Sequence, residues 1–263
     1  MNAAEREKVI RYYSASGDEA LAARLLDLAE KADKQGRFGI SEFLDPYGLA
    51  MAETMAAYFP RVHVSANGGY ENAERARAVF VSEDFPGEPD CKLAAVAVKW
   101  DKRYYQLSHR DVLGAIMGLG CKRELFGDIV MVEEGCQVIL DKASLPYFLS
   151  NLLSIGSAQV TTEEIPLEAL QPKEERVKEI RATVAALRLD AVAAAGYGVS
   201  RSKMTEEIKG QGIKLNFREV KNAAQTVKEG DIISFRGRGR VEVASVNGTT
   251  KKGRTSLLLK RYM

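Results

Sequence analysis

Residues 93–163 contain a regular order of predicted strands and helices that few folds can accommodate. Leu93 to Trp100 is an uninterrupted apolar run typical of a buried strand, and Ser108 with Asp111 forms a capping box that starts a helix. The predicted segments are a strand at 93–100, a helix at 108–117, strands at 128–132 and 136–140, a helix at 145–154 and a strand at 157–162. The order β-α-β-β-α-β predicts a ferredoxin-like or RRM-like domain.

The N-terminal 60 residues are predicted to form a helical unit. Leu21, Leu25 and Leu28 recur on one face of a helix that Gly36 can stop, and Pro46 follows Asp45 at the start of a second helix. Strands expected near 61–65 and 78–82 extend the central domain to 61–163. Residues 164–180, with two prolines and five acidic residues, are expected to be a linker to a domain at 181–263. The predicted class is therefore α+β.

Charge is divided unevenly along the 263 residues. From Arg181 onward the chain has 17 basic and 7 acidic residues, a net charge of +10, whereas residues 1–180 carry −8 from 21 basic and 29 acidic residues. Such asymmetry indicates that the basic C-terminal segment binds a polyanion and that residues 1–180 form domains of ordinary charge. A solvated basic surface without a partner is the alternative that charge alone leaves open.

The basic segment contains an ordered pattern that resembles the S4 RNA-binding domain. It runs from Arg188-Leu-Asp through Ser200-Arg-Ser-Lys and Ile213-Lys-x-Asn216 to Val227-x-x-Gly-Asp-Ile232. The resemblance implies two short helices and an adjoining turn that face RNA. Gly237 and Gly239 lie in a following Arg-Gly-Arg-Gly-Arg turn, which suits phosphate contact or simply a tight loop.

The candidate RNA-binding residues lie within this pattern. Ser200 is expected to cap a helix whose free N–H groups favour phosphate, and the nearby Arg and Lys residues add positive charge. The residues predicted to contact RNA are Arg188, Ser200, Arg201, Ser202, Lys203, Lys209, Lys214, Asn216, Arg218 and Lys221. The alternative is that Ser200 is only a cap and that the lysines are only solvated.

A wider resemblance covers nearly the full length. Gly68-Gly-Tyr-Glu-Asn-Ala-Glu-Arg-Ala-Arg and Leu107-Ser-His-Arg-Asp-Val-Leu-Gly-Ala-Ile look like the bacterial YlmH family, whose members end in an S4 module. The resemblance implies a non-enzymatic factor of ribosome-associated quality control that binds the large ribosomal subunit near peptidyl-tRNA. It also implies that the central domain contacts RNA, for which Arg110, Lys122 and Arg123 are the candidates, although exposed basic residues are ordinary.

The sequence lacks the motifs of familiar enzymes. His109-Arg-Asp111 resembles a kinase catalytic loop, but Ile116 stands where the motif needs Asn. Arg188-Leu-Asp190 resembles the catalytic segment of pseudouridine synthases, but too few residues follow it to form the catalytic domain of those enzymes. Tyrosyl-tRNA synthetases also end in an S4 domain, but their His-x-Gly-His and Lys-Met-Ser-Lys-Ser motifs are not present. No metal-ligand spacing, nucleotide loop or C-x-x-C pair is present, so we expect no catalytic residue, cofactor or metal.

The expected protein is a cytoplasmic monomer whose partners are ribosomal RNA, tRNA and the large ribosomal subunit. Residues 143–162 carry no charge but contain proline, glycine and eight polar residues, so we expect no membrane partner. Two other functions stay open: an RNA-modifying enzyme with a site in the central domain, and a cell-division scaffold that binds protein.

Overall fold

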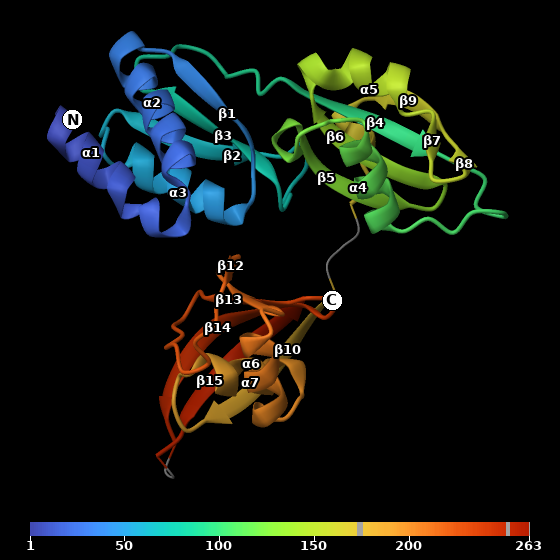
Figure 1. Cartoon of the computed structure of the whole chain (residues 1–263). Coiled ribbons are helices and arrows are strands. Elements are labelled where there is room, and N and C mark those ends of the chain that lie inside the picture. Colours follow the sequence, from blue (N-terminus) through green and yellow to red (C-terminus); the bar gives the residue numbers. More distant parts are fainter. Residues whose placement is uncertain (173–175, 251–252, 263) are drawn as a thin grey trace. The chain divides into compact units, whose positions relative to one another are not determined.

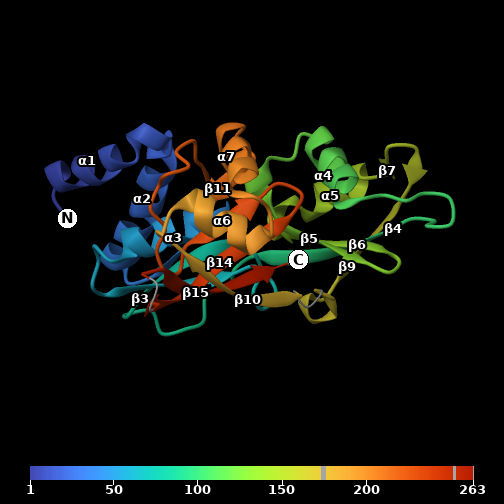
Figure 2. The same cartoon turned by 90° about the horizontal axis from the view of Figure 1, so that it is seen from below.

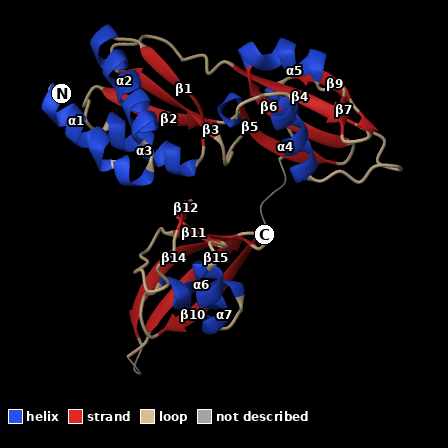
Figure 3. Ribbon diagram, viewed as in Figure 1, coloured by secondary structure: helices blue, strands red, loops and turns tan. Residues whose placement is uncertain are grey.

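The computed structural model describes residues 1–172, 176–250 and 253–262. The chain forms two compact units, Met1–Lys173 and Glu174–Met263 (Figure 1). The first unit holds two main sheets, each with its own helices, and a small two-stranded sheet, whereas the second unit holds one larger sheet with two helices (Figure 3).

The N-terminal lobe of the first unit packs helices on a three-stranded sheet. Its elements are α1 (Ala3–Tyr12), a 3-10 turn (Ser14–Ser16), α2 (Glu19–Gln35), β1 (Phe38–Leu44), α3 (Pro46–Ala56), β2 (Val62–Asn67) and β3 (Ala76–Ser82). The antiparallel order is β1-β3-β2. Leu25 of α2 and Met51 of α3 pack with Phe80 of β3 in one core. Gly36, at φ 58°, ends α2 as predicted, because glycine adopts the left-handed conformation without steric cost.

The pairing of β2 and β3 corrects the expected boundary after residue 60. The sequence predicts that both strands belong to the central domain, but β3 lies between β1 and β2 and therefore belongs with the N-terminal helices. Strand β1 was missed because Gly39, Ser41 and Glu42 interrupt its apolar pattern, and its register shifts between Ile40 and Phe43.

The central lobe confirms the ferredoxin-like prediction. Its elements are β4 (Leu93–Lys99), α4 (His109–Gly118), β5 (Phe126–Val132), β6 (Gly135–Asp141), α5 (Leu145–Asn151), β7 (Ser154–Ile155), β8 (Ala158–Gln159) and β9 (Thr161–Ile165), with 3-10 turns at Arg123–Leu125, Lys142–Ser144 and Leu167–Ala169. The order β5-β6-β4-β9 is antiparallel throughout, and α4 and α5 lie on one side of it (Figure 2). The final strand starts later than predicted, because residues 154–159 form the small β7-β8 hairpin.

Part of the opposite face of the central sheet is covered, so this part cannot stack bases as the open sheet of an RRM domain does. Phe43 of β1 packs on Val130 and Ile139, and Tyr70 and Leu170 join the same cluster. The Gly68–Arg77 motif makes part of this cover, because Tyr70 Oη donates to Asp128 at 2.8 Å. The residues of this cluster are therefore not available for RNA contact.

Arginines of the Gly68–Arg77 motif also connect the two lobes. Arg75 Nη2 donates to the carbonyl of Phe43 at 2.9 Å and to that of Arg123 at 3.1 Å. Arg77 Nη1 donates to Asp141 at 2.9 Å, and both side chains of this ion pair are largely buried. The motif thus has a structural role within the first unit.

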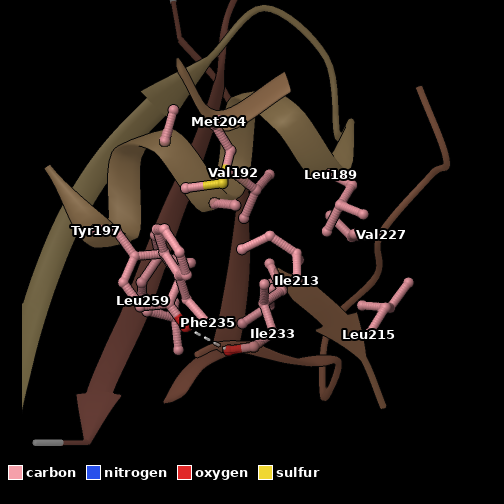
Figure 4. Packing of buried hydrophobic residues seen from close by; sticks show 14 of the residues in the cluster. Leu189, Val192, Tyr197, Met204, Ile213, Leu215, Val227, Ile233, Phe235 and Leu259 are labelled. Atoms are coloured by element: carbon pink, nitrogen blue, oxygen red, sulfur yellow. Dashed lines mark hydrogen bonds between the residues drawn. The ribbon is translucent and has the colours of Figure 1, made fainter. Parts of the chain in front are cut away.

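The C-terminal unit places two helices on one face of a six-stranded sheet. Its elements are β10 (Val177–Val184), α6 (Leu189–Tyr197), α7 (Arg201–Lys209), β11 (Ile213–Leu215), β12 (Arg218–Glu219), β13 (Ile232–Phe235), β14 (Gly239–Thr249) and β15 (Thr255–Tyr262). The order is β10-β15-β14-β13-β11-β12. Leu189, Met204 and Ile213 meet Leu259 in the core, and Tyr197 Oη donates to the carbonyl of Ile233 (Figure 4).

The expected linker at 164–180 is shorter in the structure. Ile165 ends β9, and Val177 starts β10, which pairs with β15 along its whole length. Residues 173–175 of that linker lie outside the described residues. Strand β10 was missed because Lys178, Glu179 and Arg181 give it a polar sequence, as suits an edge strand with one exposed face.

Candidate RNA interface

The buried carboxylate of Asp190 holds two arginines together at the start of α6. Asp190 accepts from Arg188 Nε at 3.2 Å and Nη2 at 2.9 Å, and from Arg201 Nη2 at 3.1 Å. The backbone amides of Leu189 and Asp190 donate to the carbonyls of Gln225 and Ala223 and thereby fix this helix end to the loop before β13. Both arginines are among the predicted RNA contacts, whereas the sequence pattern did not indicate that Asp190 joins them.

Asp190 is charged at neutral pH, so the cluster has two positive groups around one negative group. Burial raises the pKa of this carboxyl, but the hydrogen bonds from Arg188 and Arg201 outweigh burial and hold the pKa below its ordinary value. The Asp190 side chain is 4% exposed, whereas those of Arg188 and Arg201 are 39% and 54% exposed. Each guanidinium therefore keeps N–H donors that can meet an RNA phosphate.

The start of α7 adds backbone donors to these side chains. Ser200 Oγ accepts from the amide of Lys203 at 3.3 Å, which confirms Ser200 as a helix cap. The amides of Arg201 and Ser202 precede the first intrahelical bond, and the side chains of Ser202 and Lys203 are exposed. We call Arg188, Ser200, Arg201, Ser202 and Lys203 the α6–α7 surface.

The other predicted basic residues lie at separate places in the C-terminal unit. Lys209 is in the last turn of α7. Lys214 is exposed between the buried Ile213 and Leu215, so its side chain leaves the sheet on the face opposite the helices. Arg218 is exposed on β12, and Lys221 comes just before the loop that fixes the start of α6. Lys221 is two residues from Ala223, whose carbonyl accepts from the amide of Asp190, whereas Lys209, Lys214 and Arg218 come from three other elements.

Asn216 is exposed, and its side chain also has a structural role. Its backbone is left-handed at φ 49°. Its Nδ2 donates to the buried Asp231 at 2.9 Å, and its Oδ1 accepts from the amide of Ile232 at 2.9 Å. The amide group of Asn216 therefore holds the turn between β11 and β12 against β13, and its contact with RNA stays a prediction.

The central candidates also divide between structural and exposed residues. Arg123 is turned inward, because its Nη1 donates to the carbonyls of Phe126 and Gly127 and its guanidinium lies 4.4 Å from the Phe126 ring centre. Burial lowers the pKa of Arg123 to about 10, which still leaves it charged. Arg110 and Lys122 are exposed and keep their candidacy.

The structure offers little that resembles a catalytic centre. A hollow of about 390 Å³ beside the central sheet is lined in part by Lys99, Glu134, Cys136 and Gln137. Burial raises the pKa of the Cys136 thiol to about 12, so this thiol is a poor nucleophile, and both ends of the Gln137 amide bind the 169–171 backbone. Within residues 1–172, 176–250 and 253–262 no group of three potential ligands could hold a metal, and no helix has the length and apolar character to cross a membrane.

Three family models match the chain in the order of its parts. They are described as "YlmH, N-terminal" over residues 18–85, "Putative RNA-binding domain in YlmH" over residues 86–169 and "S4 domain" over residues 187–233. The first boundary agrees with the pairing of β2 and β3 with β1, and the S4 match contains the whole α6–α7 surface. The fold and these matches define an S4-domain protein of the RNA-binding class.

A curated relative narrows this class to one family. The chain is 33% identical over 245 residues to "Ribosome-associated protein quality control protein P2" of Bacillus subtilis (strain 168), a match that covers 93% of this chain and 95% of that protein. The chain belongs to the YlmH family. A solved structure, "Cell division protein ylmH from Streptococcus pneumoniae", shares its fold at 24% identity and a TM-score of 0.50, covering 59% of this chain and 94% of that one.

Proposed function

We propose that the protein binds RNA of the large ribosomal subunit, next to peptidyl-tRNA, and acts in ribosome-associated quality control without catalysing a reaction. The α6–α7 surface is the observation that carries this proposal. This surface contains two arginines that the buried carboxylate of Asp190 orients. The free backbone amides at the start of α7 lie on the same surface. Contacts of this kind hold the RNA backbone and position a protein on it rather than read a base sequence.

The chemistry of the first unit supports a binding role over an enzymatic one. Its best-formed polar network, around Arg75, Arg77 and Asp128, is occupied in joining the two lobes. The name of the Bacillus subtilis relative supports the ribosomal setting. In the central lobe, Arg110 and Lys122 are the proposed secondary contacts.

The test removes charge from the α6–α7 surface and measures the salt dependence of binding. Arg201→Ala with Lys203→Ala deletes two phosphate partners, so the slope of log affinity against log salt should become shallower by about 1.4 to 1.8. Filter binding with purified large-subunit ribosomal RNA between 50 and 300 mM KCl provides the measurement.

A matched control removes two arginines from the acidic part of the chain. Arg11 and Arg103 are 77% and 81% exposed, and the double glutamine variant lowers the net charge by the same two units. Its slope should match the wild type. Equal slopes for all three proteins would contradict the assignment of the α6–α7 surface.

A further inference from the structure

The turn between β13 and β14 carries three arginines on a short stretch of backbone. Its sequence is Arg236-Gly-Arg-Gly-Arg, and Gly237 and Gly239 are left-handed at φ 76° and φ 81°. The amide of Arg238 donates to the carbonyl of Phe235 at 2.9 Å, which closes the turn. Arg236 and Arg238 are exposed, so the turn presents concentrated positive charge to solvent.

Aromatic rings support the arginines at this end of the sheet. The guanidinium of Arg238 lies 5.1 Å from the ring centre of Phe235, and that of Arg261 lies 5.3 Å from the ring centre of Tyr197. Arg240 lies 5.7 Å from the ring centre of Tyr262. A guanidinium on an aromatic face is oriented by the ring but keeps its N–H edge available for a phosphate.

Carboxylates do not neutralise the two exposed arginines of the turn. Among the described residues, Arg236 and Arg238 form no ion pair, in contrast to Arg188 and Arg201, which share Asp190. Glu242, the nearby acid on β14, accepts from the hydroxyl of Tyr262. Exposed arginines without an acidic partner at neutral pH are well suited to a phosphate ligand.

The turn is separate from the α6–α7 surface. Tyr197, the last residue of α6, donates to the carbonyl of Gly239 at 3.0 Å, so the turn lies at the end of α6, whereas Asp190 lies at its start. Seven residues of helix place these two ends about 10 Å apart. The turn also lies beyond residue 233, where the S4 match ends.

We propose that Arg236 and Arg238 form a second RNA-binding site, which takes backbone phosphates of the same large-subunit RNA that the α6–α7 surface engages. This inference rests on the proposed function and extends it. Two sites at opposite ends of α6 would fix the orientation of the domain on the RNA, which one cluster of phosphate contacts alone does not do.

The test compares three variants in the filter-binding assay with large-subunit ribosomal RNA. Arg236→Gln with Arg238→Gln should flatten the salt slope by about 1.4 to 1.8, and the quadruple variant that adds Arg201→Ala and Lys203→Ala should flatten it by about twice as much. Arg236→Lys with Arg238→Lys keeps the charge and should keep most of the slope. The Arg11/Arg103 glutamine variant is again the control.

The outcomes separate the two proposals. A normal slope for the Arg236/Arg238 glutamine variant, together with a shallower slope for the Arg201/Lys203 variant, would overturn the second site and leave the proposed function standing. Failure of the wild type to bind the RNA would overturn both.

A second measurement uses only the wild-type protein, so it does not depend on the folding of a variant. Phenylglyoxal modifies accessible arginines, so mass spectrometry of the wild-type protein should show Arg236 and Arg238 protected when the RNA is bound. Equal modification with and without RNA would count against the second site.

Discussion

At the scale of single residues, Asp190 organises the candidate interface. One buried carboxylate sets the positions of two arginines that are 13 positions apart in sequence, and it is not itself available to RNA. Its partners are partly exposed, so each pairing contributes less to stability than a buried ion pair would. Its main consequence is to fix the arginines before RNA arrives, which lowers the entropy cost of binding.

Replacing Asp190 with asparagine should destabilise the start of α6. The variant keeps the shape but loses charged acceptors for Arg188 and Arg201, and we expect a loss of about 1–3 kcal/mol in local stability. Hydrogen–deuterium exchange of α6 peptides should show faster exchange, with peptides of α4 unchanged as the internal control. Unchanged exchange in α6 would contradict the organising role.

The difference in folding stability between the wild type and Asp190→Asn should depend on pH. Because the pKa of Asp190 is below its ordinary value of 3.8, the carboxylate stabilises the folded state fully above that value. This contribution is lost as the pH falls through the lower folded-state pKa. The stability difference between wild type and Asp190→Asn should thus be constant from pH 7 to 5 and should shrink below about pH 4. A difference already falling between pH 7 and 5 would point to another group.

At the scale of elements, the close packing of α6 on the sheet depends on Gly196. A Cβ at this position would lie 2.7 Å from a methyl group of Val241 on β14, whereas a Cβ at Gly114 of α4 would meet nothing within 4 Å. Gly196→Ala should therefore lower stability by about 1–3 kcal/mol through overpacking. Gly114→Ala should raise it by about 0.5–1 kcal/mol through helix propensity. Thermal unfolding of the two variants provides the test, and a loss at both positions would contradict the packing argument.

The elements also show where sequence reasoning succeeds and where it stops. Helix α7 begins as predicted because Ser200 caps it, and its buried apolar residues, Met204 and Ile208, recur on one face. Strands β1 and β10 were missed because their polar residues hide a half-exposed strand, and only pairing with β3 and β15 identifies them. Pairing is a long-range property that no local pattern contains.

In the candidate site, too, local features can be predicted from the sequence, whereas long-range contacts cannot. The S4-like pattern, together with local charge and helix capping, makes Arg188, Arg201 and Lys203 candidates, and these signals can be read from the sequence. The side-chain bond of Asn216 depends on Asp231, and the inward turn of Arg123 depends on carbonyls of β5. Neither contact could be predicted from the spacing of residues along the chain.

At the scale of the whole molecule, the two units differ in net charge and in the role of their arginines. The acidic first unit uses its arginines to join its own lobes, and the basic C-terminal unit carries both proposed RNA sites. RNA affinity should therefore depend mainly on residues after 176, with the central lobe contributing through a few exposed basic residues such as Arg110 and Lys122. The central claim is that the α6–α7 surface anchors the protein to the large ribosomal subunit.

Sedimentation through sucrose gradients tests this claim most directly. Bacterial lysates containing the wild type, the Arg201/Lys203 double alanine variant or the Arg11/Arg103 control would be centrifuged at low and moderate salt, and the protein detected in each fraction. The wild type and the control should travel with large subunits at low salt and dissociate as salt rises, while the double alanine variant stays at the top. A wild type that stays at the top at both salt concentrations, or a double alanine variant that travels with the subunits as the wild type does, would contradict the claim.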